Sequence, residues 1–411
     1  MNLPELPAAK PAVPHPPREQ SSVTPYAWII LVVVFLLSMA APLNQFKVPP
    51  VMPVLIEALD LTLGSAGLLM SVFAITGFFL ALPAGFILQR LGLKTTGLIA
   101  AACLVAGSLM GALSAGSSLL LFSRVVEGLG MGLISITAPA AISAWFPAEK
   151  RGAPMGIWAA WVPAGSLLMF LLAPALARDG GWQAVWWFGA AFSAAALLLY
   201  GIFMRTPPEQ TPSDLAIAAP GNAGLSRALL NREIWLLAGV FACFIYAMLT
   251  VGTFFPTFLV EQHGYTLAEA SRVLSANNAV VLVAAPLIGW LSDRTASRKL
   301  FFTVPFLLLI VLVPLVFQIA ASLVVVTFIA MGSITGAIPA VVLSAAPEVM
   351  ENPRFIGMGM AVITMGQNLG MVAGPAAFGF LAEHSTWTIA ALSLVPILFV
   401  GFILGRLVRI R

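Results

Sequence analysis

Two short stretches of this sequence share one pattern and decide the fold. The first is GFILQRLGLKT, residues 85–95, and the second is GWLSDRTASRK, residues 289–299. Each begins with a glycine, has an arginine five residues later and carries a basic residue near its end. Gly85 and Arg90 each precede their counterparts, Gly289 and Arg294, by 204 positions. The chain therefore contains an internal repeat of about half its own length.

The repeat continues beyond these stretches. Further pairs follow in the same order with offsets between 200 and 203: Pro139 with Pro339, Pro147 with Pro347, Gly156 with Gly359, and Pro174 with Pro375. One matched glycine would be expected by chance, but an ordered series would not. We interpret the two copies as two similar halves of one protein.

The composition identifies the surroundings of the chain. Of 411 residues, 60% are hydrophobic and 9% are charged, whereas a soluble domain has about 25% charged residues. Folding in water cannot hide so much apolar surface, so the chain is predicted to be an integral membrane protein in a lipid bilayer. The net charge of +4 resides in short polar breaks between apolar runs, which is typical of membrane topology and not of nucleic-acid binding.

The apolar runs are long enough to cross a membrane, since a helix needs about 20 apolar residues to do so. The sequence predicts twelve such helices, the first of them kinked by prolines. Their predicted ranges are 26–57, 64–88, 95–115, 118–145, 153–177, 182–204, 233–260, 267–291, 299–320, 323–347, 355–382 and 386–406.

The basic residues predict the orientation. With the N-terminus in the cytoplasm, sixteen of the twenty Lys and Arg residues fall on the cytoplasmic side and two on the outer side. Both termini are then cytoplasmic, in the cell (inner) membrane. Residues 1–24 are predicted to be a disordered proline-rich tail, and 206–232 a linker between six-helix bundles at 25–205 and 233–406. Six spans per copy place both copies the same way up, as a parallel repeat.

The paired stretches and two others resemble the major facilitator superfamily over residues 25–405. That family's loop motif, G-x-x-x-D-R-x-G-x-K/R-K/R, matches the first copy except at Gln89 and Thr95, and the second copy keeps the acidic residue. RVVEGLGMG at 124–132 and WFPAEKRG at 145–152 are also typical of the family. The resemblance implies a secondary transporter that works by alternating access.

The resemblance also implies a cytoplasmic gate. Glycine allows close helix contact, and charged groups at helix ends complement helix dipoles across the two halves. The first copy has Gln89 in place of the acidic residue, and this is expected to weaken the gate contact that the first copy makes. The alternative is that the loop cations only set the topology. The predicted gate residues are Gly85, Arg90, Gly289, Asp293 and Arg294.

Lys47 is the first ionisable residue predicted inside a span. Such residues are costly in lipid and usually face a cavity or a partner. Asn44 lies three positions earlier, on the same helix face, and Gln45 lies beside it. We expect Lys47 to attract an anionic substrate, with Asn44 and Gln45 donating hydrogen bonds. The alternative is a lysine that extends to the outer membrane interface.

Arg124 and Glu127 are the other two ionisable residues, three positions apart in the fourth span. One interpretation is an ion pair within the helix. The other is proton coupling, in which Glu127 takes up a proton and Arg124 responds to it or to the substrate.

Several uncharged polar or aromatic side chains inside spans are further candidates for substrate binding. For each of them, a contact between helices is an equal alternative. These residues are Trp158, Trp161, Tyr246, Asn277, Gln367 and Asn368.

Other classes of protein fit less well. No motif of a hydrolase, metalloprotease or nucleotide-binding enzyme is present, so the chain is not predicted to be an enzyme. The two cysteines, Cys103 and Cys243, give no metal-ligand spacing, and no cofactor or metal is expected. We expect a monomeric transporter of a small organic anion, by proton coupling or exchange. The alternative is a drug/proton antiporter, although the fifth-span motif of drug exporters is absent.

Overall fold

The computed structural model describes residues 23–81, 83–147, 150–205, 231–295, 298–350 and 356–409. Most of the expected tail and linker, residues 1–22 and 206–230, lie outside the described residues. The described elements are all helical: α1 Pro25–Gln45, η1 Pro49–Val51, α2 Met52–Leu59, α3 Leu63–Leu80, α4 Ala84–Ala112, α5 Ser117–Trp145, α6 Gly152–Ala159, α7 Trp161–Phe203, α9 Arg232–His263, α10 Leu267–Thr295, α11 Arg298–Val316, α12 Ala321–Thr335, α13 Ala337–Val349, α14 Ile356–His384, α15 Trp387–Leu392 and α16 Leu394–Leu407.

Within the described part of the chain, nine helical segments are long and apolar enough to cross a membrane. One of them, Gly152–Phe203, has 52 residues and is interrupted by non-helical backbone at Gly180 and Gly181. Helices α10 and α14 have 29 residues each and match two predicted spans that are not among the nine. An integral membrane fold is thus confirmed, and the count of twelve crossings stays a prediction.

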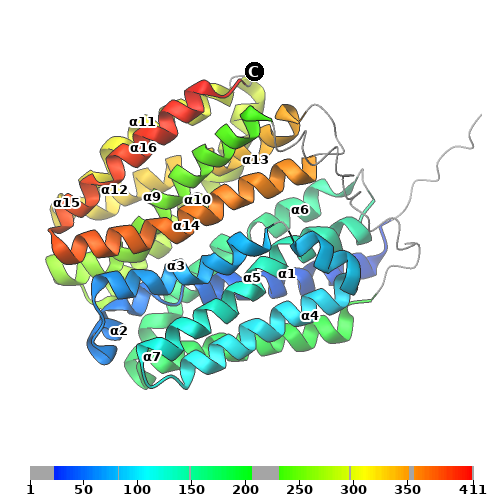
Figure 1. Ribbon diagram of the computed structural model, residues 1–411, viewed down its shortest axis with the longest axis horizontal. Coiled ribbons are helices and arrows are strands. Elements are labelled where there is room, and N and C mark those ends of the chain that lie inside the picture. Colours follow the sequence, from blue (N-terminus) through cyan, green and yellow to red (C-terminus); the bar gives the residue numbers. More distant parts are fainter. Residues whose placement is uncertain are drawn as a thin grey trace, which may run out of the picture.

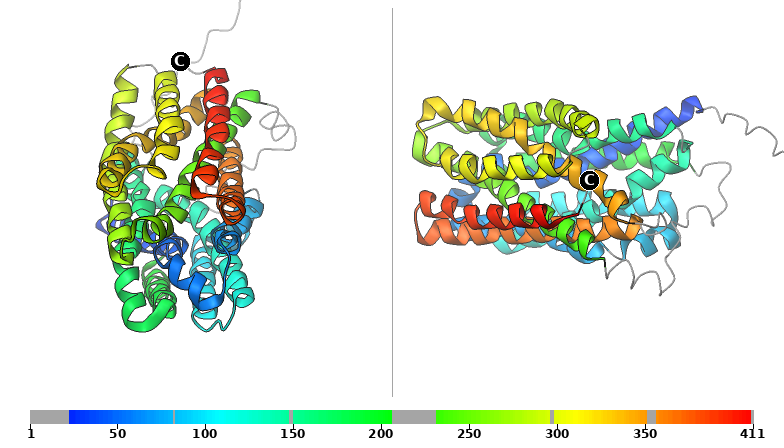
Figure 2. Two further views of the ribbon diagram at one scale, coloured as in Figure 1. Left: turned by 90° about the vertical axis from the view of Figure 1, so that its left-hand side faces the viewer. Right: turned by 90° about the horizontal axis from the view of Figure 1, so that it is seen from above.

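The helices form two groups that lie side by side. Helices α1 to α7 make up one group and α9 to α16 the other (Figure 1). The beginning of α1 and the end of α16 lie at the same end of the molecule in both Figure 1 and Figure 2, as an even number of crossings requires. The groups meet where α3 packs on α14 and where α7 packs on α10.

Helices α3 and α14 are in backbone contact at the end where α3 begins. A Cβ atom on Gly67 would lie 2.3 Å from the main-chain oxygen of Pro375, and one on Gly379 would lie 2.5 Å from that of Leu63. The Gly64 amide also donates to the carboxylate of Glu383, at 3.1 Å. Because glycines let the backbones touch, this end of the interface between the halves is tightly closed.

The first predicted span is broken rather than kinked. Helix α1 ends at Gln45, and a turn leads to the short helix η1, which begins with Pro49 and Pro50. A proline has no amide hydrogen to donate to the carbonyl four residues earlier, so the helix loses the donor for Gln45. The predicted span 26–57 corresponds to the candidate span Pro25–Leu59, and the expected kink is a break in its helix.

The second predicted span, 64–88, is interrupted near Pro83 and is helical again from Ala84 to the bend at Gly92. Helix α3 ends at Leu80 rather than residue 88, close to Pro83, and α4 begins at Ala84. Gly92 then adopts φ +76°, which breaks the helical path within α4 and favours glycine. The first repeat motif is therefore a helical segment followed by a bend, and not a loop.

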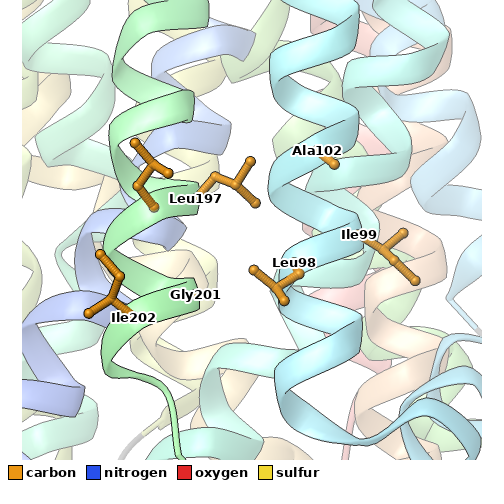
Figure 3. Close-up of a pocket in the computed structure, with 7 residues that line it drawn as sticks. Leu98, Ile99, Ala102, Leu197, Gly201 and Ile202 are labelled. Carbon is orange, nitrogen blue, oxygen red and sulfur yellow. The ribbon is translucent and has the colours of Figure 1, made fainter.

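The outer surface carries large apolar side chains, as a surface facing lipid should. Phe79, Ile202 and Val326 are 71%, 66% and 66% exposed. Between α4 and α7 this surface is hollowed into an apolar groove (Figure 3).

Candidate functional site

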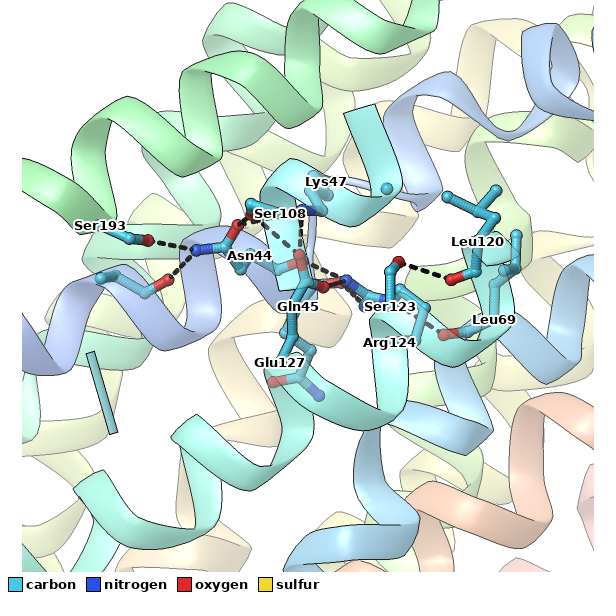
Figure 4. A network of polar contacts seen from close by, with 12 residues as sticks. Asn44, Gln45, Lys47, Leu69, Ser108, Leu120, Ser123, Arg124, Glu127 and Ser193 are labelled. Carbon is cyan, nitrogen blue, oxygen red and sulfur yellow. Dashed lines mark hydrogen bonds and ion pairs between the residues drawn. The ribbon is translucent and has the colours of Figure 1, made fainter. Parts of the chain in front are cut away.

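The three predicted ionisable residues meet in one cluster within the first half (Figure 4). Lys47 lies in the turn after α1, and Arg124 and Glu127 lie on α5. One carboxylate oxygen of Glu127 is 2.5 Å from the Lys47 ammonium, and the other is 2.5 Å from the Arg124 guanidinium. All three side chains are 0% exposed. Glu127 thus joins two cations from different elements.

Arg124 also compensates for the break in α1. Its guanidinium donates to the main-chain oxygens of Asn44, at 2.7 Å, and Gln45, at 3.0 Å. These are carbonyls of the last turn of α1, which have no amide partner ahead because the helix stops there. Unsatisfied carbonyls are costly in a membrane. A further bond, from Nε to the Leu69 oxygen at 3.0 Å, connects α5 to α3. Arg124 therefore holds three elements together.

Lys47 is fixed by polar and aromatic neighbours. Its ammonium donates to Asn44 Oδ1 at 3.0 Å and Ser108 Oγ at 2.9 Å, and it lies 4.7 Å from the ring centroid of Trp186. Ser108 Oγ also lies 2.9 Å from Glu127 Oε1, and Asn44 donates to Ser193 Oγ at 2.9 Å. The cluster therefore connects α1, α4, α5 and α7.

The charges of this cluster do not balance. Two cations and one carboxylate leave one positive charge buried when all three are ionised. Buried charge is costly unless it is paired, and aromatic rings over Lys47 and Arg124, from Trp186 and Phe73, offset part of that cost. Chemically, such a cluster can accept an anion, and its carboxylate can accept a proton.

The structure brings together Lys47, Asn44, Arg124 and Glu127 from the predicted list. Gln45 contributes its main-chain oxygen to Arg124. Lys47 does not extend to the membrane interface, because it is 0% exposed. The ion pair within the helix, Arg124 with Glu127, is present, and it is extended by the pair with Lys47.

The uncharged polar and aromatic residues that were predicted to bind substrate lie outside this cluster. Trp158 and Trp161 stack with centroids 5.5 Å apart, and Trp158 donates to Ser38 at 2.9 Å. Tyr246 is half-buried on α9. The Asn277 amide donates to the Phe328 oxygen at 2.6 Å, so it connects α10 to α12.

Gln367 and Asn368 are half-buried on α14. A Cβ atom on Gly77 would lie 2.9 Å from Asn368 Oδ1, so Asn368 faces α3 across the boundary between the halves. This position suits either a substrate contact or a contact between helices.

The predicted gate residues are only partly described. Arg90 and Arg294 are exposed, whereas the surroundings of Gly289 and the side chain of Asp293 are outside the described part of the structure. A Cβ atom on Gly85 would meet no described atom within 4 Å. Among the described residues no close helix contact is made at Gly85, and the gate stays a prediction.

Four residues whose side chains contact the cluster were not predicted: Phe73, Ser108, Trp186 and Ser193. Serines inside apolar spans were the available signal, because a hydroxyl in lipid needs a partner. The aromatic residues gave none, since phenylalanine and tryptophan are ordinary in such spans.

The model of the Major Facilitator Superfamily matches residues 34–352 of this sequence. The chain belongs to the Major Facilitator Superfamily. Transport across a membrane is the activity of this family, and the relatives described next are transporters.

Two curated relatives are each 23% identical to this chain over the aligned residues. The probable sulfoacetate transporter SauU of Cupriavidus necator aligns over 66% of this chain and 66% of its own length. The hexuronate transporter of Bacillus subtilis (strain 168) aligns over 87% of this chain and 88% of its own length. A solved bacterial homologue of the human lysosomal transporter Spinster, inward-facing and occupied, has a TM-score of 0.81 at 17% identity, over 94% of this chain and 97% of that one. That likeness shows the fold.

Proposed function

We propose that this protein transports a small organic anion by alternating access, and that its buried cluster couples the anion to a proton. The observation that carries the proposal is the carboxylate of Glu127 between Lys47 and Arg124, in a site with 0% exposure. Here Glu127 occupies the position that a substrate carboxylate would take between the same two cations.

The coupling follows from charge. Protonation of Glu127 removes the only acidic partner that the described structure gives these two cations. Two buried cations without a counter-ion are unfavourable, so the protonated state is stable only when an external anion enters. A proton and an anion therefore bind together, which is symport. Release of both restores the ion pairs seen here.

The substrate class is supported by charge and by the relatives. A cluster with a net positive charge attracts carboxylates and repels lipophilic cations, which argues against the drug/proton antiporter. Sulfoacetate and hexuronates, named for two relatives, are organic anions. Tyr246, Gln367 and Asn368, on α9 and α14, remain candidate contacts for the rest of such a molecule.

We place both termini in the cytoplasm of the cell membrane. The support is the distribution of Lys and Arg, together with the position of the beginning of α1 and the end of α16 at one end of the molecule (Figure 1). The end where α3 and α14 touch then faces outward. Residues Gly85, Arg90, Gly289, Asp293 and Arg294 then lie at the inner end, where we propose that they form the gate.

Uptake into proteoliposomes tests this function. Glucuronate and glucose differ at one carbon, which carries a carboxylate only in glucuronate. The two sugars therefore form a matched pair of test substrates, one anionic and one neutral. We expect a proton gradient directed into the vesicles, with the outside more acidic, to drive accumulation of an organic anion such as glucuronate or sulfoacetate. The same gradient should not drive accumulation of glucose. Lys47→Ala should lose anion uptake. Glu127→Gln should lose accumulation but keep exchange of internal for external anion. Arg272→Gln, at an exposed site, is the control. Uptake of glucose in preference to anions, or proton-driven accumulation by Glu127→Gln, would refute the proposal.

A further inference from the structure

The apolar groove between α4 and α7 lies on the outer surface of the first half (Figure 3). Leu98, Ile99 and Ala102 of α4 face Leu197, Gly201 and Ile202 of α7 across a volume of about 530 Å³. Ile202 is 66% exposed, so the groove is open to the surroundings. In a membrane protein, those surroundings are lipid.

Small residues create the groove. A Cβ atom on Gly201 would meet a single side chain, Leu98 Cδ2 at 3.5 Å, and Ala102 has only a methyl group. The helices close up beside the groove, where a Cβ atom on Gly97 would lie 2.4 Å from the Tyr200 ring. The hollow is thus a local feature of this helix pair.

Two cations lie at one end of the groove. Lys94 is exposed and precedes Leu98 by one helical turn, on the same face of α4. Arg205 is exposed, follows Ile202 by three residues, and its guanidinium carbon lies 5.1 Å from the centroid of the Tyr26 ring of α1. The Tyr200 hydroxyl donates to the Leu93 oxygen at 2.9 Å, which holds these ends of the helices together. Apolar side chains next to cations match the boundary between acyl chains and headgroups.

We propose that this groove binds one anionic glycerophospholipid. An acyl chain lies between α4 and α7, and the phosphate lies near Lys94 and Arg205. The stretch from Leu98 to Ala102 rises about 6 Å, enough for several methylene groups of one chain. With the orientation proposed above, the lipid belongs to the cytoplasmic leaflet.

A second copy of this chain fits the groove less well. Copies in one membrane pair about a two-fold axis along the membrane normal, which places the same ends of both molecules together. Lys94 and Arg205 would then face the same cations of the partner. Lipid phosphate has the complementary charge.

Native mass spectrometry of the purified full chain tests the proposal, with phosphatidylglycerol and phosphatidylcholine of identical acyl chains as probes. We expect one phosphatidylglycerol to be retained about tenfold more strongly than phosphatidylcholine, given two cations at the site. Lys94→Gln combined with Arg205→Gln should remove this preference. Gly201→Phe, or the milder Ala102→Leu, should reduce retention of both lipids.

Two control variants match these changes away from the groove. Val311→Phe adds an aromatic ring on another lipid-facing surface, where Val311 is 63% exposed, and Arg272→Gln removes an exposed cation. Both should bind lipid like the wild type. Unchanged phosphatidylglycerol retention in the groove-filling variants would overturn the proposal, as would an unchanged preference in the double variant. A dimer that Ala102→Leu disrupts would assign the groove to a second copy.

Discussion

The ammonium of Lys47 lies 2.5 Å from the carboxylate of Glu127, although 80 positions separate them in the chain. The carboxylate also binds Arg124, so one acid serves two buried cations. Removal of Glu127 therefore leaves two positive charges in the cluster, whereas removal of either cation leaves one neutral ion pair.

Removal of Glu127 should be far more damaging to stability than removal of Lys47. Glu127→Leu leaves two buried cations unpaired, and breaking a buried pair in this way costs about 3–5 kcal/mol. Lys47→Met leaves Arg124 and Glu127 as a neutral pair, so its cost should be lower by about 2 kcal/mol or more. Thermal unfolding in detergent measures both. The exposed pair of Arg178 and Asp179 supplies the control, because Asp179→Asn should leave unfolding unchanged. Equal losses of thermal stability in Glu127→Leu and Lys47→Met would contradict this count of the buried charges.

Arg124 should not tolerate lysine. Arg124→Lys keeps the charge, but a single ammonium cannot reach the oxygens of Leu69, Asn44 and Gln45 as the guanidinium fork does. Each buried carbonyl left without a donor costs about 1–3 kcal/mol. We expect lower thermal stability and faster hydrogen exchange of the main-chain amides around the break in α1. Lys47→Arg makes the opposite exchange of cations at the other basic residue of the cluster and serves as the comparison. Unchanged exchange in Arg124→Lys would show that other donors satisfy these carbonyls.

Gly128 and Gly252 should respond oppositely to alanine. A Cβ atom on Gly128 would lie 2.0 Å from the Phe73 main-chain oxygen, so α5 must move away from α3, whereas one on Gly252 meets no described atom within 4 Å. Overpacking costs about 1–3 kcal/mol, and alanine in an open helix position gains up to about 1 kcal/mol over glycine. Gly128→Ala should therefore unfold at a lower temperature than the wild type, and Gly252→Ala at the same or a higher one. Tolerance of Gly128→Ala would mean that the two helices separate easily.

The contact between α3 and α14 should control access from its end of the molecule. Gly379→Leu would force a side chain against the Leu63 oxygen and hold the helices apart. Ser71→Cys on α3 reports the opening, since Ser71 is 1% exposed and its hydroxyl accepts the Ala376 amide of α14 at 3.1 Å. In a chain with Cys103 and Cys243 replaced by serine, we expect Gly379→Leu to speed alkylation of this cysteine by a water-soluble reagent. Gly252→Leu, at an open position, should not. Equal rates in both variants would show that this contact does not seal the protein.

The sequence alone determined the membrane fold, the two halves and the family. These follow from properties that are local or periodic: runs of about 20 apolar residues, scattered cations and a motif repeated after 204 positions. It also identified Lys47, Arg124 and Glu127, because an ionisable residue inside an apolar run is conspicuous wherever it lies.

Only the tertiary structure decided how these residues act on each other. Spacing along one helix predicts the pair of Arg124 with Glu127, since residues three apart share a face. It cannot predict that Lys47 reaches Glu127, or that Arg124 supplies donors to the carbonyls of the broken α1, because both depend on how α1 packs against α5. The prolines of the first span indicated a distortion, yet a kink and a break have the same sequence pattern. The break persists here because a side chain from another helix satisfies the backbone groups that it exposes.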